Sequence, residues 1–280
     1  MRDQTFMTLM RLLPKSALSS AVGMATRAKV PAPLHHTAIA AFVRKYRVAM
    51  DEAEHSLDAY PTFGEFFARR LKPGLRPIEG DPKAVISPVD GAVSQAGPIE
   101  AGQCLQAKGI CFPVSKLLGD PAEAEAFDGG SFATLYLAPR DYHRIHAPLG
   151  GEIESYRYLP GQFWPVNPIS VRSKDALFCL NERLITYLST TAGRVAVVAV
   201  GATCVSRIRA SYDEITTHRG ESGRLHRYPA PLPILKGEEL GLFEMGSTVI
   251  LLFQRDRVKW SQALVEEAKV QMGQRIGALT

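Results

Sequence analysis

The run Val195-Ala196-Val197-Val198-Ala199-Val200 decides the fold, because an uncharged, valine-rich hexamer is typical of a buried strand. Phe132-Ala133-Thr134-Leu135-Tyr136-Leu137 has the same character, and a third such run covers 248–254. Further short apolar runs, separated by Gly and Pro, lie at 84–89, 92–98, 153–159, 177–180 and 184–189. Helical patterns in this part are few, and 113–119, 120–127 and 260–272 are the best candidates. The sequence therefore predicts an α+β fold whose body, 76–280, is β-rich and sandwich- or barrel-like.

The N-terminal region has a different composition from this body. Residues 1–50 hold eight Lys or Arg and one acid, a net charge of +7, while the rest of the chain carries 33 − 8 = 25 basic and 28 − 1 = 27 acidic residues. Apolar patterns at 5–13 and 16–28 predict two helices. After the break at Pro31-Ala32-Pro33, Ile39, Phe42, Val43, Tyr46 and Met50 form one face of a third.

These helices have three possible uses. They could pack on the body as ordinary surface helices, or lie on an anionic membrane as a basic amphipathic anchor. Nucleic acid is a weaker third partner, because the basic residues belong to no recognisable nucleic-acid motif. No apolar run is long enough to span a bilayer, and the N-terminus does not have the pattern of a secretory signal. We favour a membrane-associating helical region over 1–75, and no nucleic acid.

Gly246-Ser247-Thr248 immediately precedes the strand-like run 248–254. The serine offers a hydroxyl beside an unhindered glycine carbonyl, but Gly-Ser-Thr is also an ordinary turn sequence. Asp90 and the pair His143 and His146 are further candidates. Asp90 precedes a glycine and could be a simple turn residue. The histidines could be solvated or part of a zinc site, although no third ligand is evident and we expect no metal.

A hydroxyl nucleophile needs a base, and the base needs an orienting carboxylate. Ser247, His146 and Asp90 could supply these roles. The chain has no G-x-S-x-G nucleophile elbow.

Taken together, these motifs resemble the bacterial, pyruvoyl-dependent phosphatidylserine decarboxylase family. The resemblance covers nearly the whole chain and rests on Ser87–Gly91, Tyr142–His146, Phe243–Thr248, Thr62–Arg70, Arg76-Pro77-Ile78, Lys108-Gly109, Asn181-Glu182-Arg183 and Val200-Gly201-Ala202-Thr203. One departure is Met245, where the family's best-known form has leucine. The two side chains are similar in volume, so we expect function to be kept.

The resemblance implies a self-cleaving proenzyme. Ser247 Oγ would attack the Gly246 carbonyl, with His146 as base and Asp90 orienting it. The products would be a β chain, 1–246, and an α chain, 247–280, which starts with a pyruvoyl group made from Ser247. That cofactor would form a Schiff base with phosphatidylserine and release CO2 and phosphatidylethanolamine, with His143 protonating the carbanion.

The same resemblance implies a homodimer in phospholipid biosynthesis, bound peripherally to the cytoplasmic side of the inner membrane. Phe163, Trp164 and Asn167 could line the lipid entrance or complete the edge of a core. Two other classes stay open from the residues alone. One is a membrane-associated serine hydrolase that uses the same three residues, and the other is a non-enzymatic lipid-surface module whose Gly-Ser-Thr is only a turn.

Overall fold

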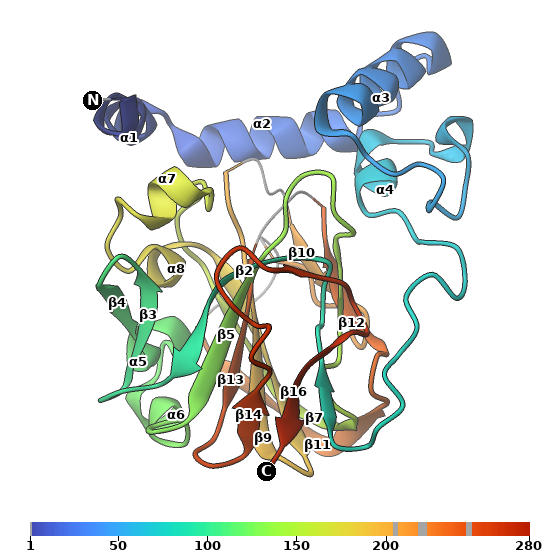
Figure 1. Cartoon of the computed structure of the whole chain (residues 1–280). Coiled ribbons are helices and arrows are strands. Elements are labelled where there is room, and N and C mark those ends of the chain that lie inside the picture. The colour runs from blue at the N-terminus through green and yellow to red at the C-terminus, as the bar shows by residue number, and fades with distance from the viewer. Residues whose placement is uncertain (1, 204–206, 218–222, 245–247) are drawn as a thin grey trace.

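The computed structural model describes residues 2–203, 207–217, 223–244 and 248–280, so Met245, Gly246 and Ser247 lie outside the described residues. Its helices are α1 (Arg2–Leu12), α2 (Lys15–Arg27), α3 (Ala32–Tyr46), the 3₁₀ turn η1 (Leu57–Ala59), α4 (Phe63–Phe67), α5 (Val114–Leu118), α6 (Pro121–Glu125), α7 (Pro168–Val171) and α8 (Leu177–Leu180). The first three form a layer across one end of a β-rich body (Figure 1). The predicted α+β class is confirmed.

One large sheet organises the body, with the strand order β11-β7-β8-β9-β13-β5-β2-β15. Its members are β2 (Gly91–Pro98), β5 (Ser131–Tyr136), β7 (Gly151–Leu159), β8 (Arg183–Thr190), β9 (Gly193–Val200), β11 (Leu225–Ile234), β13 (Thr248–Phe253) and β15 (Lys269–Val270). The two clearest runs of the sequence, 132–137 and 195–200, lie on either side of the run 248–254 here. All six residues of β13 pair antiparallel with β5 on one side and with β9 on the other.

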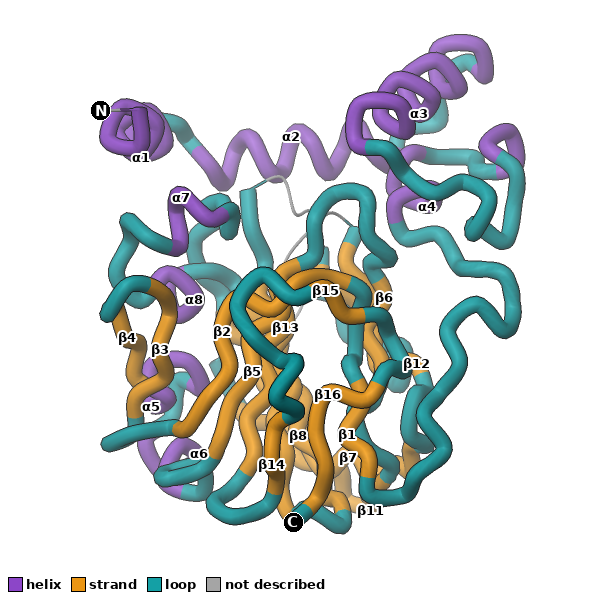
Figure 2. The backbone as a smooth tube through the Cα atoms, viewed as in Figure 1, coloured by secondary structure: helices purple, strands orange, loops and turns teal. Residues whose placement is uncertain are grey.

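Smaller sheets flank this one (Figure 2). They are β1-β16-β14, β10-β12-β6 and the hairpin β3-β4. Their bounds are β1 (Ala84–Ile86), β3 (Gln103–Ala107), β4 (Ile110–Pro113), β6 (Arg144–His146), β10 (Ile208–Ala210), β12 (Glu239–Phe243), β14 (Val258–Trp260) and β16 (Arg275–Leu279). Within the described residues the edge strands β11 and β15 do not pair with each other, so the large sheet does not close into a barrel.

Two element predictions were wrong. Residues 177–180 form α8 instead of a strand, and the Gln106 side chain accepts a hydrogen bond from Leu177 N at 2.9 Å. Residues 260–272 form turns and strand β15 instead of a helix, because their backbone pairs with β2 through Glu267 N to Val93 O at 2.8 Å. In both cases tertiary partners outweigh the local pattern.

The N-terminal region has a small core of its own. Ile39, Val48, Tyr60 and Phe66 form a buried cluster separate from the core of the body. The third helix starts at Ala32, earlier than predicted, with Pro33 in its first turn, where a missing N–H costs nothing. These facts agree with a division near residue 75, which stays a prediction.

Candidate active site

The two histidines lie beside the strand that leads to the Gly-Ser pair. Strand β6 pairs antiparallel with β12, so that His146 is opposite Glu239 and Arg144 is opposite Leu242. One step further, Phe243 N donates to His143 O at 3.0 Å. His143 is therefore opposite a residue only three positions before Gly246. His146 is opposite a residue seven positions before it.

Gly246 and Ser247 fall between two described strand ends. Strand β12 ends at Phe243, and β13 begins at Thr248, opposite Tyr136 of β5 and Val200 of β9. Tyr136 is opposite Ala92 of β2 in turn. Asp90, two residues before Ala92, therefore lies two strands away from the beginning of β13, which is about 10 Å at the usual strand spacing.

His143 is fully enclosed, at 0% exposure, and its ring contacts that of Phe67 in a tilted arrangement with centroids 4.2 Å apart. Its Nδ1 donates to Asp141 O at 2.8 Å, which leaves the lone pair on Nε2. Nε2 is buried and has no hydrogen-bond partner among the described residues. Burial lowers the pKa of His143 to about 3, so the ring is neutral near pH 7. The structure thus holds an unused proton acceptor next to the end of β12.

His146 is held in the same tautomer. Its Nδ1 donates to Gly237 O at 2.8 Å, and Tyr142 Oη donates to Nε2 at 3.1 Å. Burial also lowers the pKa of His146, and the Gly237 carbonyl acts in the opposite direction. Nε2 is the basic atom, as a general base requires.

Asp90 forms its hydrogen bonds with other groups than His146. Its carboxylate accepts from Arg76 Nη2 at 2.6 Å, from Arg76 Nε at 3.0 Å and from Met272 N at 2.8 Å. The carboxylates of Asp90 and Glu52 raise the pKa of Arg76 above its ordinary value. His146 N donates to Pro88 O at 2.8 Å, so His146 and Asp90 belong to adjoining segments. In the described residues, however, Gly237 and not Asp90 orients the His146 ring.

The predicted lipid-contacting residues are mostly enclosed. Phe163 and Trp164 are buried, and Lys15 Nζ of α2 covers the Trp164 ring at 4.1 Å from its centroid. The Asn167 side chain caps α7 by accepting from Ser170 N at 3.0 Å. Lipid contact by Trp164 therefore requires Lys15 to move away, and the role of these three residues stays a prediction.

Helix α2 contacts both sides of this region. One end reaches Trp164 through Lys15. At the other end, Arg27 Nη1 donates to Glu244 Oε2 at 2.9 Å, two residues before Gly246. With 13 residues α2 is about 20 Å long. It lies across one end of the β-rich body (Figure 1), and its contact through Arg27 places Glu244 at that end.

Three contributors were not singled out from the sequence. Arg76 lies in a motif that supports the family resemblance, but no local pattern indicates its pairing with a carboxylate 14 positions away. Tyr142 and the carbonyl of Gly237 fix the His146 ring, and backbone carbonyls leave no compositional signal. No group of three or more His, Cys, Asp or Glu in the described part of the chain is placed to hold a metal ion.

The lowered pKa of His143 predicts a pH-dependent stability. Below pH 6.5 the unfolded ring takes up a proton, whereas the folded ring stays neutral down to about pH 3. The unfolded state then binds more protons, so this residue's contribution to stability is complete above pH 6.5 and falls as the pH drops. His143→Gln should remove up to about 1.4 kcal/mol per pH unit from the pH dependence of the unfolding free energy.

Urea unfolding between pH 4.5 and 7.5, in the Ser247→Ala background, measures this effect in a single chain. The comparison uses the pH slopes of the two proteins and not their absolute stabilities, because the glutamine alters packing at every pH. Equal slopes would contradict the burial of a neutral His143.

Comparisons with known proteins identify the family of this chain. A family model described as phosphatidylserine decarboxylase matches residues 63–278. A protein of Myxococcus xanthus (strain DK1622) named phosphatidylserine decarboxylase proenzyme is 63% identical over 280 residues, covering 100% of both chains. Proteins with the same name are 54% identical in Anaeromyxobacter sp. (strain K), with 99% of each chain covered, and 42% identical in Shewanella baltica (strain OS155 / ATCC BAA-1091), with 97% of this chain and 96% of the relative covered. The chain belongs to the phosphatidylserine decarboxylase family.

Proposed function

We propose that this chain decarboxylates phosphatidylserine to phosphatidylethanolamine and CO2, after cutting itself between Gly246 and Ser247. One observation of the structure carries the proposal beyond family membership. His143 Nε2 is buried without a hydrogen-bond partner among the described residues, and the backbone of His143 pairs with Phe243 at the end of β12, three residues before Gly246. A buried polar atom without a partner is costly and is typical of a site that receives another group.

For the self-cleavage, we assign His146 as the base that removes the Ser247 hydroxyl proton. Its tautomer is fixed by the Gly237 carbonyl, so the basic atom is Nε2. The serine oxygen would attack the Gly246 carbonyl and convert the amide into an ester. Elimination then separates the chains, and hydrolysis leaves the pyruvoyl group at residue 247. We assign Asp90 as the carboxylate that supports His146; its segment adjoins His146 through the hydrogen bond from His146 N to Pro88 O.

The pyruvoyl group supplies an acceptor for the electrons released with CO2. The residues of the chain accept and deliver the proton of the reaction. His143 is neutral before substrate arrives and so accepts at Nε2 instead of donating. An anionic substrate carboxylate in this enclosed space would raise the pKa of His143 and allow the ring to take up a proton. The ring could then deliver that proton to the carbon that has lost CO2.

The N-terminal layer fits a peripheral contact with an anionic membrane. Six of the eleven exposed large hydrophobic side chains in the described residues lie within residues 1–34, among them Leu12 at 79% and Met24 at 65% exposure. Basic residues share these helices, with Arg11 in the last turn of α1 and Arg27 in that of α2. Apolar contact and anionic attraction together give interfacial binding. No helix of the described chain is both long and apolar enough to cross a bilayer.

We accordingly assign 1–75 as the membrane-associating region and 76–280 as the catalytic domain. The anionic surface would be the cytoplasmic side of the inner membrane. The exposed apolar face and the helix that covers Trp164 then lie where a membrane lipid approaches. A homodimer belongs to the same proposal.

Loss of the exposed apolar side chains should weaken membrane binding. Leu12→Glu with Met24→Glu removes two apolar contacts and adds two charges that an anionic surface repels, so we expect the vesicle partition coefficient to fall at least about tenfold. Co-sedimentation with vesicles of phosphatidylglycerol and phosphatidylcholine measures it. Leu235→Glu controls for the same kind of change elsewhere, because Leu235 is 75% exposed but lies between β11 and β12 on the body. Equal losses in both proteins would argue against the N-terminal contact.

Denaturing mass spectrometry, together with a decarboxylation assay, tests the function itself. We expect a chain that ends at Gly246 and a 34-residue chain, 247–280, that is lighter than its serine form by the mass of ammonia. The active protein should release CO2 from phosphatidylserine in detergent micelles. An intact chain labelled by a fluorophosphonate at Ser247 would indicate a serine hydrolase. An intact, unlabelled and inactive chain would indicate a lipid-binding module.

A further inference from the structure

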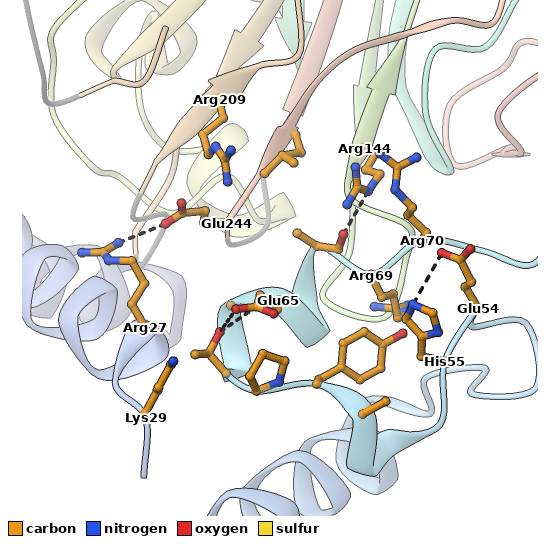
Figure 3. Close-up of a pocket in the computed structure, with 17 residues that line it drawn as sticks. Arg27, Lys29, Glu54, His55, Glu65, Arg69, Arg70, Arg144, Arg209 and Glu244 are labelled. Atoms are coloured by element: carbon orange, nitrogen blue, oxygen red, sulfur yellow. Dashed lines mark hydrogen bonds and ion pairs between the residues drawn. The ribbon is translucent and has the colours of Figure 1, made fainter. Parts of the chain in front are cut away.

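A cationic cavity of about 630 Å3 lies between the N-terminal helices and the β body. Its walls come from the end of α2, from the segment around η1 and α4, and from strands β6, β10 and β12 (Figure 3). Six cationic side chains line it, against three carboxylates. The cations are Arg27, Lys29, Arg69, Arg70, Arg144 and Arg209, and the carboxylates are Glu54, Glu65 and Glu244.

Arg69 is the unusual member of this group. It is only 3% exposed, and its Nη2 donates to the carbonyls of Arg140 at 2.8 Å and Asp141 at 3.3 Å. Its Nε and Nη1 are buried without a hydrogen-bond partner in the described part of the chain. Burial lowers the pKa of Arg69, yet a guanidinium stays charged at neutral pH. The charge of this buried guanidinium favours an anion in the adjoining cavity.

The carboxylates of the cavity have other partners. Glu244 accepts from Arg27 Nη1 at 2.9 Å, and Glu65 Oε1 accepts from Thr62 Oγ1 at 3.4 Å. Glu54 lies 3.9 Å from His55.

Six cations face four carboxylates once Glu239 is counted, so a surplus of positive charge remains. Arg70 and Arg144 pair with Glu239, which lies outside this cavity. The side chains of Arg209 and Lys29 have no ion pair or hydrogen bond among the described residues, and in Figure 3 the guanidinium of Arg209 points into the space between Glu244 and Arg144. Arg69, Arg209 and Lys29 thus leave a surplus of positive charge around one cavity.

We propose that this cavity binds a phosphate group, with Arg69 at its buried wall and Arg209 and Lys29 at its outer walls. Guanidinium forks match the oxygens of a phosphate, and a lysine adds a point charge. The volume is far larger than a single halide ion needs. The cavity adjoins α2, whose exposed apolar residues form part of the proposed membrane contact. The headgroup of an anionic phospholipid and free inorganic phosphate share the chemistry that this site recognises.

This cavity adjoins the reacting centre without including its assigned residues. His143, His146 and Asp90 do not line it, whereas Glu244, two residues before Gly246, does. The two places are nevertheless linked, because Arg69 Nη2 and His143 Nδ1 both donate to the carbonyl of Asp141. An anion on Arg69 is therefore one peptide carbonyl away from the ring assigned to the proton step.

Isothermal titration calorimetry of the full-length protein tests the site with two probes, inorganic phosphate and dihexanoyl-phosphatidylglycerol. Both are titrated at constant ionic strength, set with sodium chloride. The lipid has no amine and cannot be decarboxylated, so its binding does not depend on the proposed reaction. We expect saturable binding of one equivalent of at least one probe. If phosphate alone binds, the ligand of the cavity is a free anion; if the lipid alone binds, it is a phospholipid headgroup. Binding of both probes means that the cavity recognises the phosphate group itself.

The variant Lys29→Gln/Arg209→Gln should weaken that binding at least about tenfold, because it removes two charged donors. Both side chains are at the surface, so the fold should survive even where Arg69→Gln does not. Arg255→Gln removes one positive charge from an exposed arginine beyond the opposite end of β13 and controls for a general loss of positive charge. Failure of both probes to bind, unchanged binding by the double variant, or an equal loss in Arg255→Gln would overturn the proposal.

Discussion

Replacing Ser247 with alanine is expected to leave one uncut chain of 280 residues and to abolish decarboxylation. The proposed cleavage begins with the serine oxygen, and the same residue supplies the carbon atoms of the pyruvoyl group. Alanine provides neither the nucleophile nor the precursor of the ketone. Activity should therefore fall to the uncatalysed rate and not by a partial factor, as when a covalent catalyst is removed.

Gel electrophoresis under denaturing conditions and CO2 release measure the two losses. Ser247→Thr is the conservative control, since it keeps a hydroxyl on the same carbon and should still be cut, although more slowly because of its extra methyl group. Normal two-chain material from Ser247→Ala would contradict the assigned cleavage site.

Replacing the two histidines should separate the cut from the decarboxylation. His146→Ala removes the proposed base, so the precursor should accumulate uncut. His143→Ala should still be cut, but the two-chain product should lose about 10²–10⁴-fold in kcat, the usual contribution of a positioned acid or base. The KM for phosphatidylserine should change far less, because the ring is assigned to a proton and not to binding.

Time courses of cleavage and of CO2 release, measured on the same preparations, decide between the roles. The strand register allows a sharp alternative, since His143 is opposite Phe243 and His146 is opposite Glu239. If His143→Ala stays uncut and His146→Ala is cut normally, then His143 is the base for cleavage and His146 acts in the decarboxylation. His143→Gln keeps a polar side chain of similar size and controls for the cavity that alanine leaves.

The central part of the fold could be predicted from the sequence because its signal is local. The runs at 132–137, 195–200 and 248–254 are uncharged and mostly apolar, and they form three adjacent strands. The stretch 260–272 has a helix-like pattern, but its backbone N–H and C=O groups pair with β2. This pairing joins residues about 170 positions apart, so a local stretch of sequence carries no sign of it.

The candidate site shows the same limit. Asp90, His143 and His146 could be chosen by residue type and by the resemblance. Their hydrogen bonds could not be derived, because they end on Arg76, on the backbone of Met272 and on the carbonyls of Asp141 and Gly237. The expected contact between Asp90 and His146 is the clearest example. Arg76 is buried beside Asp90 and forms an ion pair with its carboxylate, so Asp90 is paired with Arg76 and not with His146.

The position of β13 affects whether the protein can refold after it has been cut. The strand is hydrogen-bonded along its full length to β5 and β9, and the segment after it adds β14, β15 and β16 to two sheets. An uncut precursor folds as a single molecule. After a cut at Gly246, the same sheet could re-form only by an encounter of two separate chains, at a rate that depends on their concentration. The mature form would then stay folded because it unfolds slowly, which is kinetic stability. Once unfolded, its two chains would not readily refold together.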